Sequence, residues 1–127
     1  MSVAAASEPS RLAAQAVGVV ESIAFLLQAN LAEMAASLPP QSAIQVSGGL
    51  SQLDDLCQRL ADLAGVPVRR VAHPEATARG TAFLLAGQPA HWADGLETTR
   101  FRPAPNPALA ARHQRWQEAM TAALEQA

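Results

Sequence analysis

The sequence predicts an α/β fold built on a βαβ unit, with a long helix before the unit and two helices after it. Residues 42–47 and 66–71 have the alternating apolar pattern of short strands. Residues 51–64, between them, repeat apolar residues at helical spacing. A strand, a helix and a strand of these lengths form a parallel pair with a right-handed crossover. The chain has 127 residues, the size of one domain.

The long first helix is predicted over residues 10–37. Its apolar residues recur at spacings of three and four, namely Leu12, Ala16, Val19, Ile23, Leu27, Leu31, Met34 and Leu38. Ser10 can cap its start, and Pro39 with Pro40 stops it. The helix is apolar on more than one side, so we expect it to have two neighbours. Residues 1–9 lack this period and are expected to form a flexible tail.

Two glycines stand where the first strand meets its helix. Ile44 and Val46 alternate with polar neighbours and lead directly into Gly48 and Gly49. Glycine has no Cβ, so the backbone there can take a positive φ and a flat ligand can approach it closely. The helix that follows points its N–H groups and positive end toward the same spot, which suits an anion or a nucleotide. The same pair of glycines is also typical of a simple tight turn.

The helix after the glycines is predicted to begin with a capping box. Ser51 is the expected N-cap, and Asp54 reaches back to it. Gly65 fits the position just after the helix. Pro67 stands near the start of the second strand, where its missing N–H matters least. The side chains expected to be buried on this helix are Leu53, Leu56, Cys57, Leu60 and Ala64.

Two further helices are expected in the second half of the chain. The first runs from Glu75 to about Ala86, and its small residues around Gly80 predict close packing, either within this domain or against a partner. Residues 87–107 are rich in proline and polar residues. The last helix is predicted over residues 107–127. Its expected buried side chains are Leu109, Trp116, Met120 and Leu124.

Composition excludes several classes of protein. The formal net charge is −2 and there is no lysine, which leaves little basic surface for nucleic acid and excludes a P-loop or a Schiff base. The single Cys57 excludes an internal disulfide and a cysteine-rich zinc site. We recognise no secretory signal and no stretch long enough to span a membrane, so we expect a cytoplasmic protein. The pairs Arg69 with Arg70 and Arg112 with Arg115 are expected to be solvated.

Large apolar residues that could form a core are scarce. Alanine accounts for 29 of the 127 residues, with three phenylalanines and two tryptophans. Two strands are also too few to cover the apolar faces of these helices. We therefore expect part of a larger fold, a compact unit with exposed apolar surface and a tendency to self-associate.

Four segments, in order, have a more specific pattern. They are residues 20–25 with 31–34; residues 44–49 followed by Gln58, Ala61, Asp62 and Gly65; residues 75–82; and His91, Trp92, 101–103 and Trp116. Together they resemble the C-terminal lobe of the FGGY carbohydrate kinases, in the superfamily of sugar kinases and actin. The second segment is similar to the family's adenosine motif, the third to the motif that connects the two lobes, and the fourth to the tail of glycerol kinases.

The resemblance implies a partial actin-like ATPase lobe, with a ribonuclease H-like fold, over residues 10–127. It implies phosphoryl transfer from Mg-ATP to a sugar or polyol hydroxyl. Gly48 and Gly49 would lie along the adenosine of ATP. Leu50 and Leu53 complete the candidate cofactor-binding residues, but they stand where the family has a small residue and a polar residue.

No residue matches the family's phosphate-gripping hairpin, its aspartate general base or its sugar-binding residues, so we assign no catalytic or metal-binding residue. The first hypothesis is a kinase fragment that is inactive alone. Its expected partner is an N-terminal kinase lobe on another chain, or a second copy of this chain. The alternative is a non-catalytic interaction or regulatory module derived from the same lobe. A nucleotide-binding domain that acts alone would need phosphate contacts that we do not find.

Overall fold

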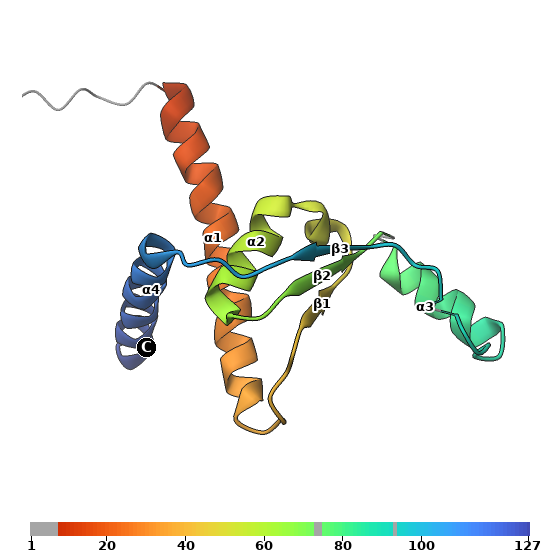
Figure 1. Ribbon diagram of the computed structural model, residues 1–127. Helices are drawn as coiled ribbons and strands as arrows, with labels where there is room; N and C mark the ends of the chain where they lie inside the picture. Colours follow the sequence, from red (N-terminus) through yellow and green to blue (C-terminus); the bar gives the residue numbers. More distant parts are fainter. Residues whose placement is uncertain (1–7, 73–74, 93) are drawn as a thin grey trace, which may run out of the picture.

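The computed structural model describes residues 8–72, 75–92 and 94–127. Helices and strands alternate along the chain after a long first helix (Figure 1). The elements are α1 (Glu8–Ala35), β1 (Ile44–Val46), the 3₁₀ turn η1 (Gly49–Gln52), α2 (Asp54–Ala64), β2 (Val68–Val71), α3 (Ala76–Leu85), β3 (Thr98–Phe101) and α4 (Pro107–Glu125).

A three-stranded sheet in the order β1-β2-β3 forms the centre of the fold. β1 and β2 are parallel, with Ile44 opposite Val68, which confirms the predicted βαβ unit. β3 runs antiparallel to β2, with Phe101 opposite Val68. The expectation of two strands was therefore wrong, because β3 lies inside the proline-rich segment 87–107. It pairs along the side of β2 that β1 leaves free.

The core lies between α2 and one face of the sheet. Buried residues of α2 and β2 form its centre, namely Cys57, Leu60, Ala61 and Val68. Leu31 of α1 and Phe101 of β3 pack against this cluster, and α1 packs along α2. Side chains alternate across a strand, so Arg69 and its β3 partner Arg100 lie on the other face, where both are exposed. The core is small, as the alanine-rich composition predicts.

The start of α2 differs from the predicted capping box. Its N-cap is Leu53, which makes no side-chain capping hydrogen bond. Ser51 lies inside η1, and its hydroxyl donates to a backbone carbonyl of the preceding turn at 2.6 Å. Asp54 pairs with Arg70 of β2 and does not cap the helix. Leu53, expected to be buried, is consequently 42% exposed.

The end of α2 follows the prediction. Gly65 has φ 70° in the left-handed region, and its N–H donates to the carbonyl of Ala61. A left-handed residue at this position commonly ends a helix, and glycine adopts that conformation without steric cost. Leu56 is buried as expected. Ala64, in the last turn, is half-buried.

α1 begins at Glu8, two residues before the predicted cap Ser10, so residues 8 and 9 belong to the helix. The remainder of the predicted tail, residues 1–7, lies outside the described residues. By length and composition α1 could cross a membrane, which our sequence expectation overlooked; a core helix of a soluble protein meets the same criteria. The buried residues of α1 lie in its middle, namely Glu21, Ala24 and Phe25.

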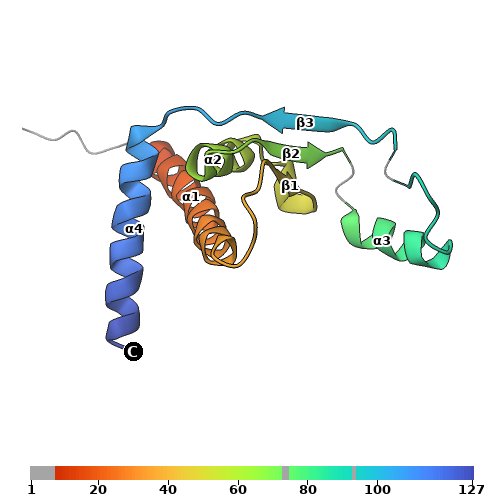
Figure 2. The same ribbon diagram turned by 60° about the horizontal axis from the view of Figure 1, so that its bottom comes forward.

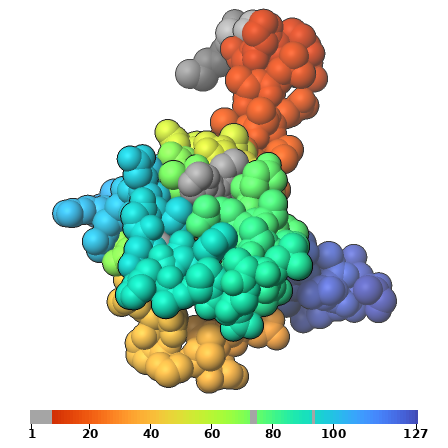
Figure 3. Space-filling model, turned by 90° about the vertical axis from the view of Figure 1, so that its right-hand side faces the viewer, coloured from red at the N-terminus to blue at the C-terminus, as the bar shows by residue number. Residues whose placement is uncertain are grey.

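α3 and α4 lie at opposite ends of the sheet (Figure 2). α3 has no buried residue within the described chain, so the close packing around Gly80 is not made within this domain, and packing against a partner stays a prediction. Figure 3 shows the first part of α1 and the far end of α4 standing clear of the body. The molecule is therefore less compact than the sequence predicts.

α4 is anchored by its first half. Leu109 is fully buried, whereas Met120 and Leu124, both predicted to be buried, are 42% and 72% exposed. Trp116 is half-buried. The guanidinium of Arg112 donates to Glu21 Oε1 at 2.6 Å, so this arginine, predicted to be solvated, is ion-paired although its side chain is 41% exposed.

Two polar residues of α2 fasten the segment that precedes α4. Gln58 Nε2 donates to the carbonyl of Arg102 and to Asp62 Oδ1, both at 2.8 Å. Asp62 also accepts from the backbone N–H of Ala104 at 2.9 Å and from the amide of Asn106 at 3.3 Å. Gln58 and Asp62 belong to the second of the four segments with a specific pattern in the sequence. Their contacts have a structural role, because they place the start of α4 over α2.

We expect the docking of α4 on α1 to weaken at acidic pH. The ring of His113 lies 5.2 Å from that of Phe25 and 6.0 Å from that of Trp116, and its buried Nε2 has no hydrogen-bond partner among the described residues. Burial lowers the pKa of His113 below its ordinary 6.5. The stabilisation is therefore complete above pH 6.5 and is lost as the pH falls through the lowered pKa.

Thermal unfolding at several pH values between about 7.5 and 5 tests this expectation. The melting temperature of the parent should fall more steeply with pH than that of His113→Phe, which keeps the ring packing. His91→Phe, at an 82% exposed side chain, should behave like the parent. Parallel curves for the parent and His113→Phe would contradict the prediction.

Candidate functional site

The glycine pair lies where the end of β1 turns toward α2. Gly48 has φ 93°, a conformation that residues with a side chain rarely adopt, so this position is restricted to glycine by its backbone. Among the described residues, no atom beyond the two chain neighbours lies within 4 Å of the place where a Cβ would stand on either Gly48 or Gly49. The surface beside both glycines is therefore bare and open to the approach of a ligand.

Local hydrogen bonds hold the turn in shape. The backbone N–H of Ser51 donates to the carbonyl of Gly48 at 3.2 Å, and its hydroxyl donates to the same oxygen at 2.6 Å. The N–H of Leu53 donates to the carbonyl of Leu50 at 3.1 Å. These bonds turn the side chains of Leu50 and Leu53 outward, where they are 57% and 42% exposed.

Arg70 reaches the same turn from β2. Its Nη1 donates to the carbonyl of Ser51 at 3.2 Å and to Asp54 Oδ1, and its guanidinium lies 5.1 Å from the centre of the Phe101 ring. The hydrogen bond to Asp54 raises the pKa of Arg70. The prediction of a solvated arginine was therefore wrong here too.

Cys57 lies beneath the turn. Its Sγ donates to the carbonyl of Ser51 at 3.3 Å, so this carbonyl accepts from both Cys57 and Arg70. Burial raises the pKa of the Cys57 thiol, which keeps it neutral. We therefore assign it a structural role.

A pocket of about 420 Å³ opens beside the turn. Its wall is mostly apolar and comes from α1, β1, the turn and α2, with Ile23 and Leu27 on α1, Val46 on β1, Leu50 in the turn, and Leu56 and Leu60 on α2. Of the four predicted site residues, Leu50 lines the pocket, while Gly48, Gly49 and Leu53 do not. Such a wall suits a flat, largely apolar group. The α1 residues Ile23 and Leu27 were missed as site residues, although both belong to the apolar stripe that the sequence shows on that helix.

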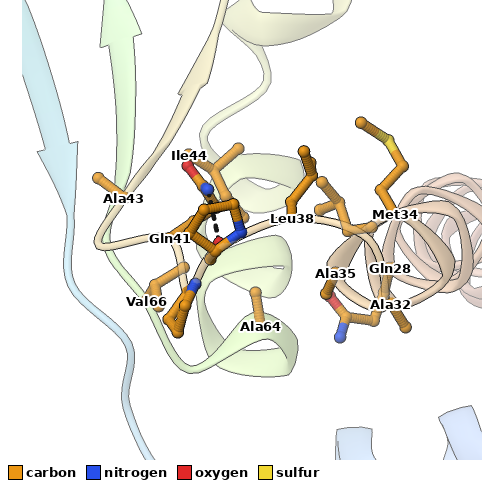
Figure 4. A pocket seen from close by; sticks show the side chains of 13 residues that line it. Gln28, Ala32, Met34, Ala35, Leu38, Gln41, Ala43, Ile44, Ala64 and Val66 are labelled. Carbon is orange, nitrogen blue, oxygen red and sulfur yellow. Dashed lines mark hydrogen bonds between the residues drawn. The ribbon is translucent and has the colours of Figure 1, made fainter.

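A second pocket, of about 360 Å³, lies at the opposite end of β1 (Figure 4). Met34, Leu38 and Val66 are among its apolar lining residues. Gln41 Nε2 donates to the carbonyl of Pro39 at 2.7 Å along its rim. No titratable side chain lines this pocket, so it offers no group for acid or base chemistry.

The carboxylates near the turn are already paired. Asp54 binds Arg70, and Asp55 accepts from Arg59 Nε at 2.9 Å. Within the described ranges no three His, Cys, Asp or Glu residues gather in a way that could hold a metal ion. The arrangement can bind a ligand at the turn and in its pocket, and the two carboxylates beside the turn are held in ion pairs.

The known proteins that are similar to this chain are carbohydrate kinases. Residues 2–88 match the C-terminal domain of the FGGY family of carbohydrate kinases. A glycerol kinase of Koribacter versatilis is 36% identical over 115 residues, covering 80% of this chain and 22% of the relative. A glycerol kinase of Xanthobacter autotrophicus is 40% identical over 86 residues, covering 65% of this chain and 17% of the relative. The chain thus spans about a fifth of the length of these relatives.

Two solved structures share the fold. The gluconate kinase from Lactobacillus acidophilus aligns with a TM-score of 0.58 and 21% identity, over 90% of this chain and 24% of that one. The ligand-bound xylulose kinase from the same organism aligns with a TM-score of 0.55 and 22% identity, over 76% of this chain and 21% of that one. The chain therefore belongs to the FGGY family of carbohydrate kinases, as part of a C-terminal domain.

Proposed function

We propose that this chain is the adenosine-binding portion of an ATP-dependent sugar or polyol kinase, with its sheet forming part of an actin-like, ribonuclease H-like lobe. The observation that carries the proposal is the turn at Gly48, which follows β1, precedes α2 and adjoins an apolar pocket. In α/β sheets ligands bind at the carboxyl ends of the parallel strands, and a helix N-terminus attracts phosphate. The adenine would enter the pocket beside Leu50, Gly48 and Gly49 would lie along the adenosine, and the phosphates would extend toward the N-terminus of α2.

The remaining steps of the reaction are assigned to a separate part of the kinase. Sugar binding, the general base, the grip on the phosphates and the Mg²⁺ ion would come from an N-terminal lobe, which we propose as the partner of this chain. Support comes from the extent of the match, which covers 22% of a glycerol kinase. On this proposal the chain alone transfers no phosphate.

Isothermal titration with ATP and ADP tests the proposal, with Gly48→Ala as the informative variant. We expect binding by the parent and at least a tenfold loss in the variant, because a Cβ at φ 93° strains the turn. Gly65→Ala is the control: its φ of 70° and ψ of 15° are in the left-handed region, which a Cβ strains less than the φ of 93° and ψ of 179° of Gly48, and it lies at the other end of α2. Both variants should lose stability, and the control should keep its affinity.

Two results would contradict the proposal. The first is the absence of a binding signal for either nucleotide with the folded parent. The second is equal affinity in Gly48→Ala and the parent. The same preparations are assayed for ATP-dependent phosphorylation of glycerol, xylulose and gluconate, and product formed by the chain alone would overturn the assignment of the catalytic groups to a partner.

One observation favours the alternative of a non-catalytic interaction module. Leu50 and Leu53 place two exposed apolar side chains at the turn, where a nucleotide-binding loop of this family has small and polar residues. Leu84 and Leu85 of α3 are also 63% and 85% exposed. Such side chains favour association with a second protein surface or a second copy. Two results together would support this function over the first. The titration would show no binding of ATP or ADP, and the chain would sediment in a concentration-dependent way that Leu50→Ser and Leu53→Ser abolish.

A further inference from the structure

We infer that Arg70 is a positioning residue for the glycine turn and that it screens Asp54 from the phosphates of a bound nucleotide. The inference rests on the proposed function, and it concerns a residue outside the four that the sequence assigns to the site. It follows from where Arg70 lies, what it donates to, and which charge it neutralises.

Arg70 connects three parts of the fold. From β2 it crosses to the carbonyl of Ser51 at 3.2 Å, inside η1 and two residues after Gly49. Its guanidinium is held between this carbonyl and the Phe101 ring, and the side chain is 16% exposed. The planar, multi-donor guanidinium can bind a carbonyl and a carboxylate while it stacks on a ring, which a lysine ammonium cannot do. The turn is thus tied to the sheet by a contact between residues 19 positions apart.

The second role concerns charge. Asp54 is the first residue of α2, and its side chain is 76% exposed. A carboxylate there stabilises the helix N-terminus, but it also opposes the positive field that would attract phosphate to the same helix end. Arg70 pairs with this carboxylate. Without Arg70, the uncompensated charge of Asp54 would repel ATP much more than uncharged adenosine.

The matched variants are Arg70→Met and Arg69→Met. Both remove one positive charge from β2, but Arg69 is exposed on the opposite face of the sheet. In Arg70→Met we expect the affinity for adenosine to fall about threefold and that for ATP about thirtyfold. The added change Asp54→Asn should return the ATP loss to about threefold, because it removes the repelling charge. Arg69→Met should change both affinities by less than about twofold.

Equal losses for adenosine and ATP in Arg70→Met, or no recovery with Asp54→Asn, would overturn the screening role. Amide hydrogen exchange tests the positioning role without a nucleotide. The N–H groups of Ser51 and Leu53, which bond within the turn, should exchange about tenfold faster in Arg70→Met and at the parent rate in Arg69→Met. Unchanged exchange in Arg70→Met would overturn the positioning role.

The two roles can be separated from the proposed function. If the parent binds neither adenosine nor ATP, the proposed function and the screening role both fail. Amide hydrogen exchange still decides whether Arg70 positions the turn.

Discussion

Replacing Leu109 by alanine should lower the free energy of unfolding by about 3 kcal/mol. Leu109 is 0% exposed and is the one buried residue of α4 within the described chain. It stands in the first turn of the helix, where its N–H also bonds to the capping side chain of Asn106 at 3.2 Å. The segment before it is held to Asp62, so the chain has little freedom to collapse into the space that alanine would leave.

Leu124→Ala is the matched control, because this leucine lies on the same helix and is 72% exposed. Its effect should stay within about 0.5 kcal/mol. Urea unfolding followed by circular dichroism measures both values, and amide exchange shows whether α4 loses protection first. Similar, small effects of the two substitutions would mean that α4 does not dock through Leu109 in solution.

Replacing Arg112 by methionine should cost about 2 kcal/mol of stability. Glu21 is 6% exposed and lies in the middle of α1, where its Oε1 is 2.6 Å from Arg112 Nε and 3.5 Å from Arg59 Nη1. The substitution leaves a buried carboxylate with the more distant of its two arginines. A fully buried pair would lose more, but the Arg112 side chain is 41% exposed and water reaches part of the contact.

A second substitution separates charge from packing. Glu21→Gln added to Arg112→Met removes the uncompensated carboxylate, so the double variant should recover at least half of the loss. Arg115→Met removes an exposed arginine from the same helix and should be close to neutral. If chemical denaturation gives the same stability for Arg112→Met and Arg115→Met, the bridge from α4 to Glu21 contributes nothing measurable.

The sequence predicted the helices and the βαβ unit because their signals are local. The apolar stripe of α1 and the glycine after α2 are each visible within a short window of residues, and both match the structure. β3 gave no such signal. It has four residues, three of them exposed, and its strand character comes from pairing with β2. Ser51 followed by Asp54 matched a capping box, but in the structure Asp54 pairs with Arg70 of β2 and does not cap the helix.

The candidate site, too, could be predicted from the sequence only in part. Gly48 could be found from the sequence, because a left-handed turn between a strand and a helix requires glycine there. The pocket wall from α1 and the contact of Arg70 with the turn could not, since they join residues about twenty to forty positions apart. Loop closure between such residues is decided by the packing of whole elements.

The sequence alone determined the family, the order of the helices and first two strands, and the backbone of the glycine turn, because each depends on residue types at short, fixed spacings. Tertiary structure decided which charges are paired, where the third strand lies and which side chains of α4 are buried. These properties depend on contacts that no local pattern encodes. Met120 and Leu124 follow the helical period as well as Leu109 does, yet Leu109 alone of the three lies where another element covers it.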